Sequence, residues 1–154
     1  MSHIEVRKMT GGCGAEVLGV NLANLSNSDM EAVRQAYVDH GVIFFRDQSI
    51  TPEEHIAFAR RWGDIVINRY SPADQTYPEI AEVRKEKAQT VNIGGGWHTD
   101  HSYDPDPAMG SILVARQLPE TGGDTMFASM YAAYDALSPG LKKTLEGMRA
   151  MHSA

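Results

Sequence analysis

Residues 97–103 read WHTDHSY and follow directly on a run of three glycines, residues 94–96. On an extended strand alternate side chains point to the same side, so His98 and Asp100 would reach one point in space while Thr99 faces away. An imidazole nitrogen and a carboxylate oxygen are two of the three ligands of the facial triad that binds non-haem Fe(II). The stretch therefore predicts two ligands of a metal site, to which a further histidine should be added.

The same tripeptide has a simpler interpretation that its residues alone leave open. His-x-Asp arises by chance, and a strand histidine is commonly no more than a hydrogen-bonded side chain. The surroundings favour the metal site, because the motif leads into an apolar run, residues 110–115, in which residues 112–115 have the continuous apolar character of a buried strand.

Local signals predict an alternation of short strands and capped helices. One helix is expected from a capping box of Ser28 and Glu31 to Gly41, and a second from a capping box of Thr51 and Glu54. Ser129 and Ser138 are each expected to cap a later helix. The expected strands are residues 4–6, 15–22, 42–45, 65–67, 80–83, 112–115 and 125–127.

Five stretches together resemble the taurine dioxygenase family of Fe(II)- and 2-oxoglutarate-dependent oxygenases. These are GAEVLGVNLANLS (14–26), HGVIFFRDQSITPEEHIAFARRWGDI (40–65), WHTDHSY (97–103), PAMGSILVARQLPETGGDT (107–125) and AAYDALSPGLKKTLEGMRAMHS (132–153). They occur in the family's order, so the resemblance covers nearly the whole chain. Several separate motifs that agree in sequence and spacing are far more specific than His-x-Asp alone.

The resemblance implies an α+β protein with a mainly β core, a double-stranded β-helix or jelly roll of eight strands with flanking helices. Residues 1–154 would form a single domain, the N-terminal portion of such a jelly roll without its C-terminal part. The implied reaction uses Fe(II), the co-substrate 2-oxoglutarate and O₂, releases succinate and CO₂, and hydroxylates a small organic substrate.

The resemblance also implies roles for three residues. His98 and Asp100 match the first two iron ligands, and Thr125 matches the hydroxyl that binds the carboxylate of 2-oxoglutarate. Hydrogen bonding of a hydroxyl to a carboxylate is physically sensible there. From the residues alone Thr125 would instead be a β-former that enters the strand 125–127.

Five further positions match the substrate pocket of the family: Asn68, Tyr70, Gly94, His101 and Tyr103. Asn68 stands where the family has a sulfonate-binding histidine, and Gly94 stands where the family has an asparagine that contacts taurine. His101 and Tyr103 occupy positions that are apolar in taurine-specific members. These departures argue against taurine as the substrate and favour a differently tuned pocket. The remaining histidines have no ligand-like neighbours in the sequence.

Composition restricts the partners. The chain has 154 residues and a formal net charge of −6, and this acidic balance argues against a nucleic-acid partner bound through its phosphates. Cys13 is the single cysteine, so no intrachain disulfide or cysteine-rich zinc site can form. Without an expected signal peptide or membrane span, a cytoplasmic protein without a membrane partner is predicted.

Length sets one further expectation. Family members carry the second iron-binding histidine and an arginine for 2-oxoglutarate beyond the point that matches Ala154, so this chain is expected to be a fragment or an inactive, truncated form. An alternative of a different class is a non-catalytic interaction module that assembles with itself, as a homo-oligomer, or with another chain through open sheet edges.

Overall fold

The computed structural model describes residues 3–67, 76–91 and 94–152, and these divide into two compact units. The first unit comprises residues 1–54 and 115–148, and the second comprises residues 55–114 and 149–154.

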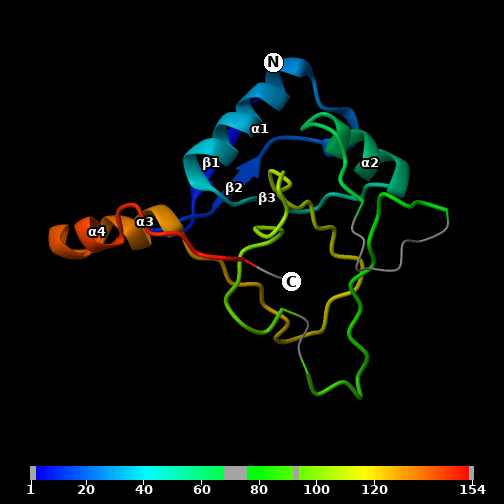
Figure 1. Ribbon diagram of the computed structural model, residues 1–154. Coiled ribbons are helices and arrows are strands. Elements are labelled where there is room, and N and C mark those ends of the chain that lie inside the picture. Colours follow the sequence, from blue (N-terminus) through cyan, green and yellow to red (C-terminus); the bar gives the residue numbers. More distant parts are fainter. Residues whose placement is uncertain (1–2, 68–75, 92–93, 153–154) are drawn as a thin grey trace. The chain divides into compact units, whose positions relative to one another are not determined.

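The first unit contains a mixed three-stranded sheet with β2 in the centre. β1 (Glu5–Lys8) pairs antiparallel with β2 (Ala15–Leu18), and β2 pairs parallel with β3 (Ile43–Phe44). Helix α1 (Asn27–His40) lies against β2 and β3 (Figure 1). The buried hydrophobic side chains of this unit are Ala15, Val17, Met30, Val33, Ala36 and Ile50.

Helix α1 begins two residues earlier than the expected capping box. The side chain of Ser26 accepts a hydrogen bond from the backbone N–H of Asp29 at 3.1 Å, so Ser26 is the N-cap. The expected cap, Ser28, instead lies in the first turn, where its hydroxyl is 2.9 Å from that of Ser26. The helix ends as predicted at Gly41, whose N–H donates to the carbonyl of Tyr37.

One acidic side chain is buried on the central strand. The residue is Glu16, which is 8 % exposed, and one carboxylate oxygen lies 3.0 Å from Nε of Arg46. The other oxygen lies 3.9 Å from a guanidinium nitrogen of Arg7, the residue paired with Glu16 across β1 and β2. A buried carboxylate needs such partners, because an isolated charge in a core is strongly unfavourable.

Helix α2 (Pro52–Arg60) begins at the predicted capping box. The N–H of Thr51 donates to the carboxylate of Glu54 at 2.7 Å, and the N–H of Glu54 donates to the hydroxyl of Thr51 at 3.2 Å. Further along, Phe58 is buried and meets Trp62 edge to face at a centroid distance of 6.1 Å.

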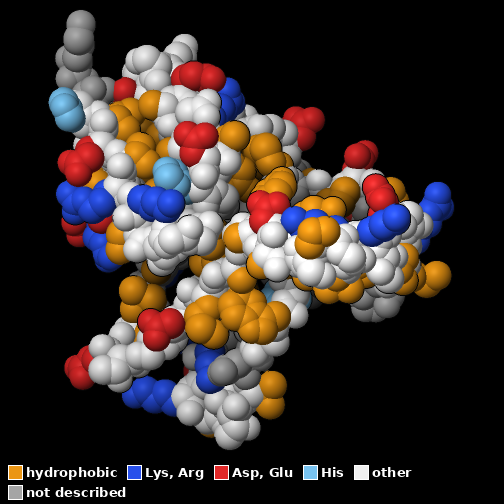
Figure 2. Space-filling view, turned by 90° about the vertical axis from the view of Figure 1, so that its left-hand side faces the viewer, with side chains coloured by type: hydrophobic (Ala, Val, Ile, Leu, Met, Phe, Trp, Pro, Cys, Tyr) orange, Lys and Arg blue, Asp and Glu red, His pale blue; other side chains and the backbone are white. Residues whose placement is uncertain are grey.

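Three short helices complete the described structure. A 3₁₀ turn, η1 (Leu22–Asn24), follows β2. Helix α3 (Met130–Asp135) is capped by Ser129, and α4 (Pro139–Leu145) is capped by Ser138, as predicted. Figure 2 shows hydrophobic side chains at the surface. In residues 115–148, the second segment of the first unit, the exposed large hydrophobic side chains include Leu118, Met126, Phe127, Met130, Tyr131 and Tyr134.

Four expected strands are not formed. Within the described residues the sheet of β1, β2 and β3 is the only one, so residues 65–67, 80–83, 112–115 and 125–127 do not build an eight-stranded jelly roll in this chain. A strand requires a ladder of hydrogen bonds to a neighbour, and these segments form none in the described part of the chain, where Ala81 alone makes an isolated bridge. Residues 112–115 also alternate between half-buried and exposed, contrary to the expectation of burial on both faces.

A search of the described helices finds none with the length and apolar character needed to cross a membrane.

Candidate metal site

The structure brings the two predicted ligands together in the second unit. Nε2 of His98 lies 3.1 Å from Oδ1 of Asp100. They converge from a loop rather than from the expected strand, because the chain begins to turn at Asp100. Two ligand atoms at about 2.1 Å from one metal ion and at right angles are about 3.0 Å apart, so the observed separation suits adjacent positions of an octahedral site.

A backbone carbonyl fixes the imidazole of His98. Nδ1 lies 2.8 Å from the carbonyl oxygen of Gly96, to which only an N–H can donate. In the protonated ring Nε2–H donates to the carboxylate of Asp100. In the neutral ring Nε2 presents its lone pair to that carboxylate, and a cation bound between the two atoms relieves their repulsion. The Gly96 carbonyl, and then the charge of Asp100, raise the pKa of His98 above its ordinary value.

Gly94 provides the space for the imidazole. Its φ is +68°, and a Cβ at this position would lie 3.3 Å from Cε1 of His98. A side chain here would be strained by the backbone and would crowd the ring. The structure thus places Gly94 against the ligand itself.

The carboxylate of Asp100 keeps one oxygen for each of two partners. Oδ1 faces His98, and Oδ2 lies 3.4 Å from the hydroxyl of Ser111, which can donate to it. The side chains of His98 and Asp100 are 55 % and 62 % exposed, so an ion can reach both. The donor set of one imidazole and one carboxylate suits Fe(II).

A third ligand is not brought to this pair. Among residues 3–67, 76–91 and 94–152, no group of three or more His, Cys, Asp or Glu side chains is placed to hold a metal ion. The described part of the chain therefore supplies two of the three protein ligands of a facial triad.

His101 lies just beyond the ligand pair and does not follow the geometry of a strand. Its φ is +54°, and its Nδ1 lies 3.0 Å from Oδ2 of Asp104, with both side chains largely buried. The ring of Tyr103 lies 5.8 Å from that of His101. The chain turns here, so His101 does not lie on the extended strand that the sequence predicts around His98 and Asp100.

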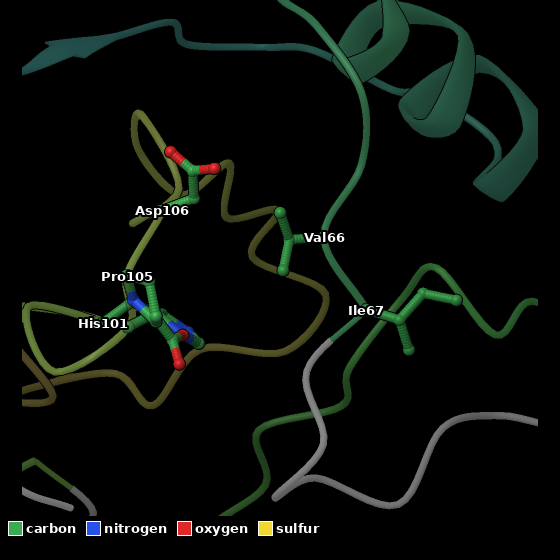
Figure 3. A pocket seen from close by; sticks show the side chains of 6 residues that line it. Val66, Ile67, His101, Pro105 and Asp106 are labelled. Atoms are coloured by element: carbon green, nitrogen blue, oxygen red, sulfur yellow. The ribbon is translucent and has the colours of Figure 1, made fainter.

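His101 lines an open hollow of about 390 Å³ in the second unit (Figure 3). Its lining consists of two carboxylates, three apolar side chains and the imidazole of His101. The lining residues are Val66, Ile67, His101, Asp104, Pro105 and Asp106. The candidates Asn68 and Tyr70 follow this wall in the sequence but lie outside the described residues.

Thr125 belongs to the first unit, where it lines a hollow of about 370 Å³. The residues around it come from the turn after β1, from β3 and from its own segment. They are Met9, Thr10, Cys13, Gly14, Val42, Phe44 and Phe127.

The sequence reasoning missed two contacts of the segment that carries the ligands. The Gly96 carbonyl lies two residues before His98, so this contact is local in the sequence. The contact between Ser102 and His152 joins residues fifty positions apart, and nothing local in the sequence indicates it.

A sequence model described as "Taurine catabolism dioxygenase TauD, TfdA family" matches residues 5–154. The chain belongs to this family. Individual relatives agree: an (S)-phenoxypropionate/alpha-ketoglutarate-dioxygenase of Sphingobium herbicidovorans is 36 % identical over 91 % of this chain and 50 % of its own length. An alkylsulfatase of Acinetobacter baylyi is 36 % identical over 98 % of this chain and 47 % of its own length.

Solved structures of the family share the fold of this chain. A taurine dioxygenase from Burkholderia xenovorans superposes with a TM-score of 0.81 at 32 % identity, over 94 % of this chain and 52 % of the other. The structure of AAD-2 in complex with Mn(II) and N-oxalylglycine gives a TM-score of 0.71 at 32 % identity, over 94 % and 50 %. The chain thus spans about half the length of the relatives it matches.

Proposed function

We propose that the whole protein is an Fe(II)- and 2-oxoglutarate-dependent dioxygenase that hydroxylates a small organic substrate and releases succinate and CO₂. The observation that carries the proposal is the approach of Nε2 of His98 to Oδ1 of Asp100 at 3.1 Å, with the ring fixed by the Gly96 carbonyl. Membership of a dioxygenase family supports it. The likeness to solved family structures supports a jelly roll for the complete protein.

The residues of this chain have distinct tasks in that reaction. Bound iron, with 2-oxoglutarate, supplies the activation of O₂. His98 and Asp100 hold the ion, and Gly94 leaves space for the imidazole. Thr125 donates its hydroxyl to a carboxylate of 2-oxoglutarate. The third ligand, a histidine, is supplied from outside the described part of the chain.

The substrate binds beside the metal in the hollow that His101 lines. Val66 and Ile67 offer an apolar wall, and the imidazole of His101, held by Asp104, offers a polar group to a substrate. This combination fits a small molecule with an apolar body and one polar group. Relatives act on phenoxypropionate and on sulfonates, while the departures at Asn68 and Gly94 argue against taurine itself.

The test is 2-oxoglutarate turnover by the full-length protein isolated from its source. We expect succinate release that depends on Fe(II) and O₂ and that increases with the right member of a panel of aryloxy-carboxylates, alkyl sulfates and sulfonates. His98→Ala and Asp100→Ala should each abolish turnover, because the two protein ligands that remain bind the ion too weakly.

The matched control is His3→Ala, which removes an exposed histidine near the start of the chain and should leave turnover unchanged. Intact turnover in both His98→Ala and Asp100→Ala would show that the metal assignment is wrong.

A second candidate function is non-catalytic association with another copy or another chain. The exposed hydrophobic side chains of residues 118–131 in the first unit favour it, because exposed apolar surface of this kind marks interaction sites. An intact mass of the native polypeptide well above 16.9 kDa, together with turnover, would favour the enzyme. A native mass of that value with stable assemblies and no turnover would favour association.

A further inference from the structure

We infer that His152 is a positioning residue that acts through Ser102. It holds the loop that carries His98 and Asp100, called the ligand loop below. Nδ1 of His152 lies 2.7 Å from the hydroxyl oxygen of Ser102, and that oxygen accepts a hydrogen bond from the hydroxyl of Thr99 at 2.8 Å. Thr99 and Ser102 stand on either side of Asp100 in the sequence. The three side chains therefore form one network that includes residues on both sides of Asp100 in the sequence, and its role in metal binding rests on the proposed function of Asp100.

The contact with His152 ties the ligand loop to a distant segment of the chain, in addition to the contacts of His98 with Gly96 and of Asp100 with Ser111. The side chains of His98 and Asp100 are more than half exposed, and the described residues give this segment no neighbouring strand. The turn itself contains His101 at φ +54°, an unfavourable conformation for a residue with a side chain. A metal site binds well only if its ligands are held in place before the ion arrives.

His152 is placed to supply this support from a distant part of the chain. Residues 149–154 group with residues 55–114 in the second unit, so the segment after α4 returns to the ligand loop (Figure 1). A hydrogen bond between positions fifty residues apart closes a long loop and fixes Ser102 against a second segment. Thr99, the residue immediately before Asp100, shares that restraint through its hydrogen bond to Ser102.

One arrangement of hydrogens satisfies every member of the network. The hydroxyl of Thr99 donates to Ser102, and the one hydroxyl hydrogen of Ser102 can donate to Nδ1 of a neutral His152. In this arrangement each hydroxyl donates once and each acceptor is used. An asparagine at position 152 places its amide at the position of Nδ1, whereas a glutamine reaches only the position of Nε2.

This difference gives a matched set of variants: His152→Ala, His152→Asn and His152→Gln. Amide hydrogen exchange at Asp104, whose N–H donates to the carbonyl of His101 at 2.9 Å, measures opening of the ligand loop in the full-length protein without any metal. We expect exchange to be about two- to tenfold faster in His152→Ala and His152→Gln, the effect of one neutral hydrogen bond, and close to wild type in His152→Asn. Ser102→Ala should match His152→Ala.

The second readout is binding of Mn(II) alone, followed by water-proton relaxation. His152→Ala should weaken Mn(II) binding by a similar factor, and His152→Asn should restore it. Unchanged exchange in His152→Ala, or equal effects of the asparagine and glutamine variants, would overturn the positioning role. Unchanged Mn(II) binding in Asp100→Ala would instead refute the proposed metal site, and the exchange results would still report on the network.

Discussion

At the scale of single residues, Gly19 occupies the most restricted backbone position. Its φ is +79°, and a Cβ added there would overlap the carbonyl oxygen of His3. We expect Gly19→Ala to lower the free energy of unfolding by about 1–3 kcal/mol, because both the left-handed backbone and the clash oppose a side chain. Urea denaturation measures the change. Gly12→Ala, which meets nothing within 4 Å, is the control and should behave as wild type.

The role proposed for Thr125 leads to a prediction on the full-length enzyme. Thr125→Val removes the hydroxyl but keeps the shape, so KM for 2-oxoglutarate should rise about 10- to 150-fold, the effect of one hydrogen bond to a charged group. Thr125→Ser should retain most of the affinity. Steady-state kinetics with 2-oxoglutarate as the varied substrate provide the measurement. An unchanged KM in the valine variant would leave Thr125 a residue of structural importance only.

Single residues also show how far sequence reasoning reaches into the site. The pair of His98 and Asp100 follows from side chains two positions apart, because their contact depends on local geometry. The supports of the pair are less accessible: Gly96 acts through a backbone carbonyl, which no residue type reveals, and His152 acts across fifty positions. His101 lies in a turn at φ +54°, where the sequence predicted an extended strand.

At the scale of secondary-structure elements, the capping box of α2 is the clearest test of a local signal. Thr51→Ala removes the hydroxyl that accepts from the N–H of Glu54 at 3.2 Å. We expect a loss of about 0.5–2 kcal/mol in the free energy of unfolding, the usual value of an N-cap. Thr51→Ser keeps the hydroxyl and should stay near wild type. Chemical denaturation followed by circular dichroism compares the three proteins, and an alanine variant as stable as wild type would contradict the capping role.

Helices were predicted better than strands, for a physical reason. The caps at Thr51, Ser129 and Ser138 act within four residues, so the sequence displays them. The one misplaced cap, Ser28, competes with Ser26 two positions away, and both are equally suitable residue types. Strands depend on a distant neighbour: β2 forms between two partners, whereas residues 112–115 have the same apolar character and find none in the described structure.

At the scale of the whole molecule, the accessible surface is large for the mass. It amounts to 12566 Å², whereas two separate compact units with this total mass would expose about 9,300 Å². The excess does not depend on how the units are placed. Part of it is apolar, since Leu113, Leu118 and Met126 are each 73 % exposed.

The last prediction follows from this surface. The isolated 154-residue chain should bind the dye ANS and associate at micromolar concentration, because apolar surface of this extent favours burial against another molecule. The net charge of −6 opposes association, so added salt should strengthen it. Sedimentation velocity measures the assembly. The double variant Leu113→Lys and Leu118→Lys should shift the equilibrium toward monomer, whereas Val38→Lys, at an exposed position on α1, should not. A wild-type chain that sediments as a dye-free monomer at high salt would show that the apolar surface is covered within the chain itself.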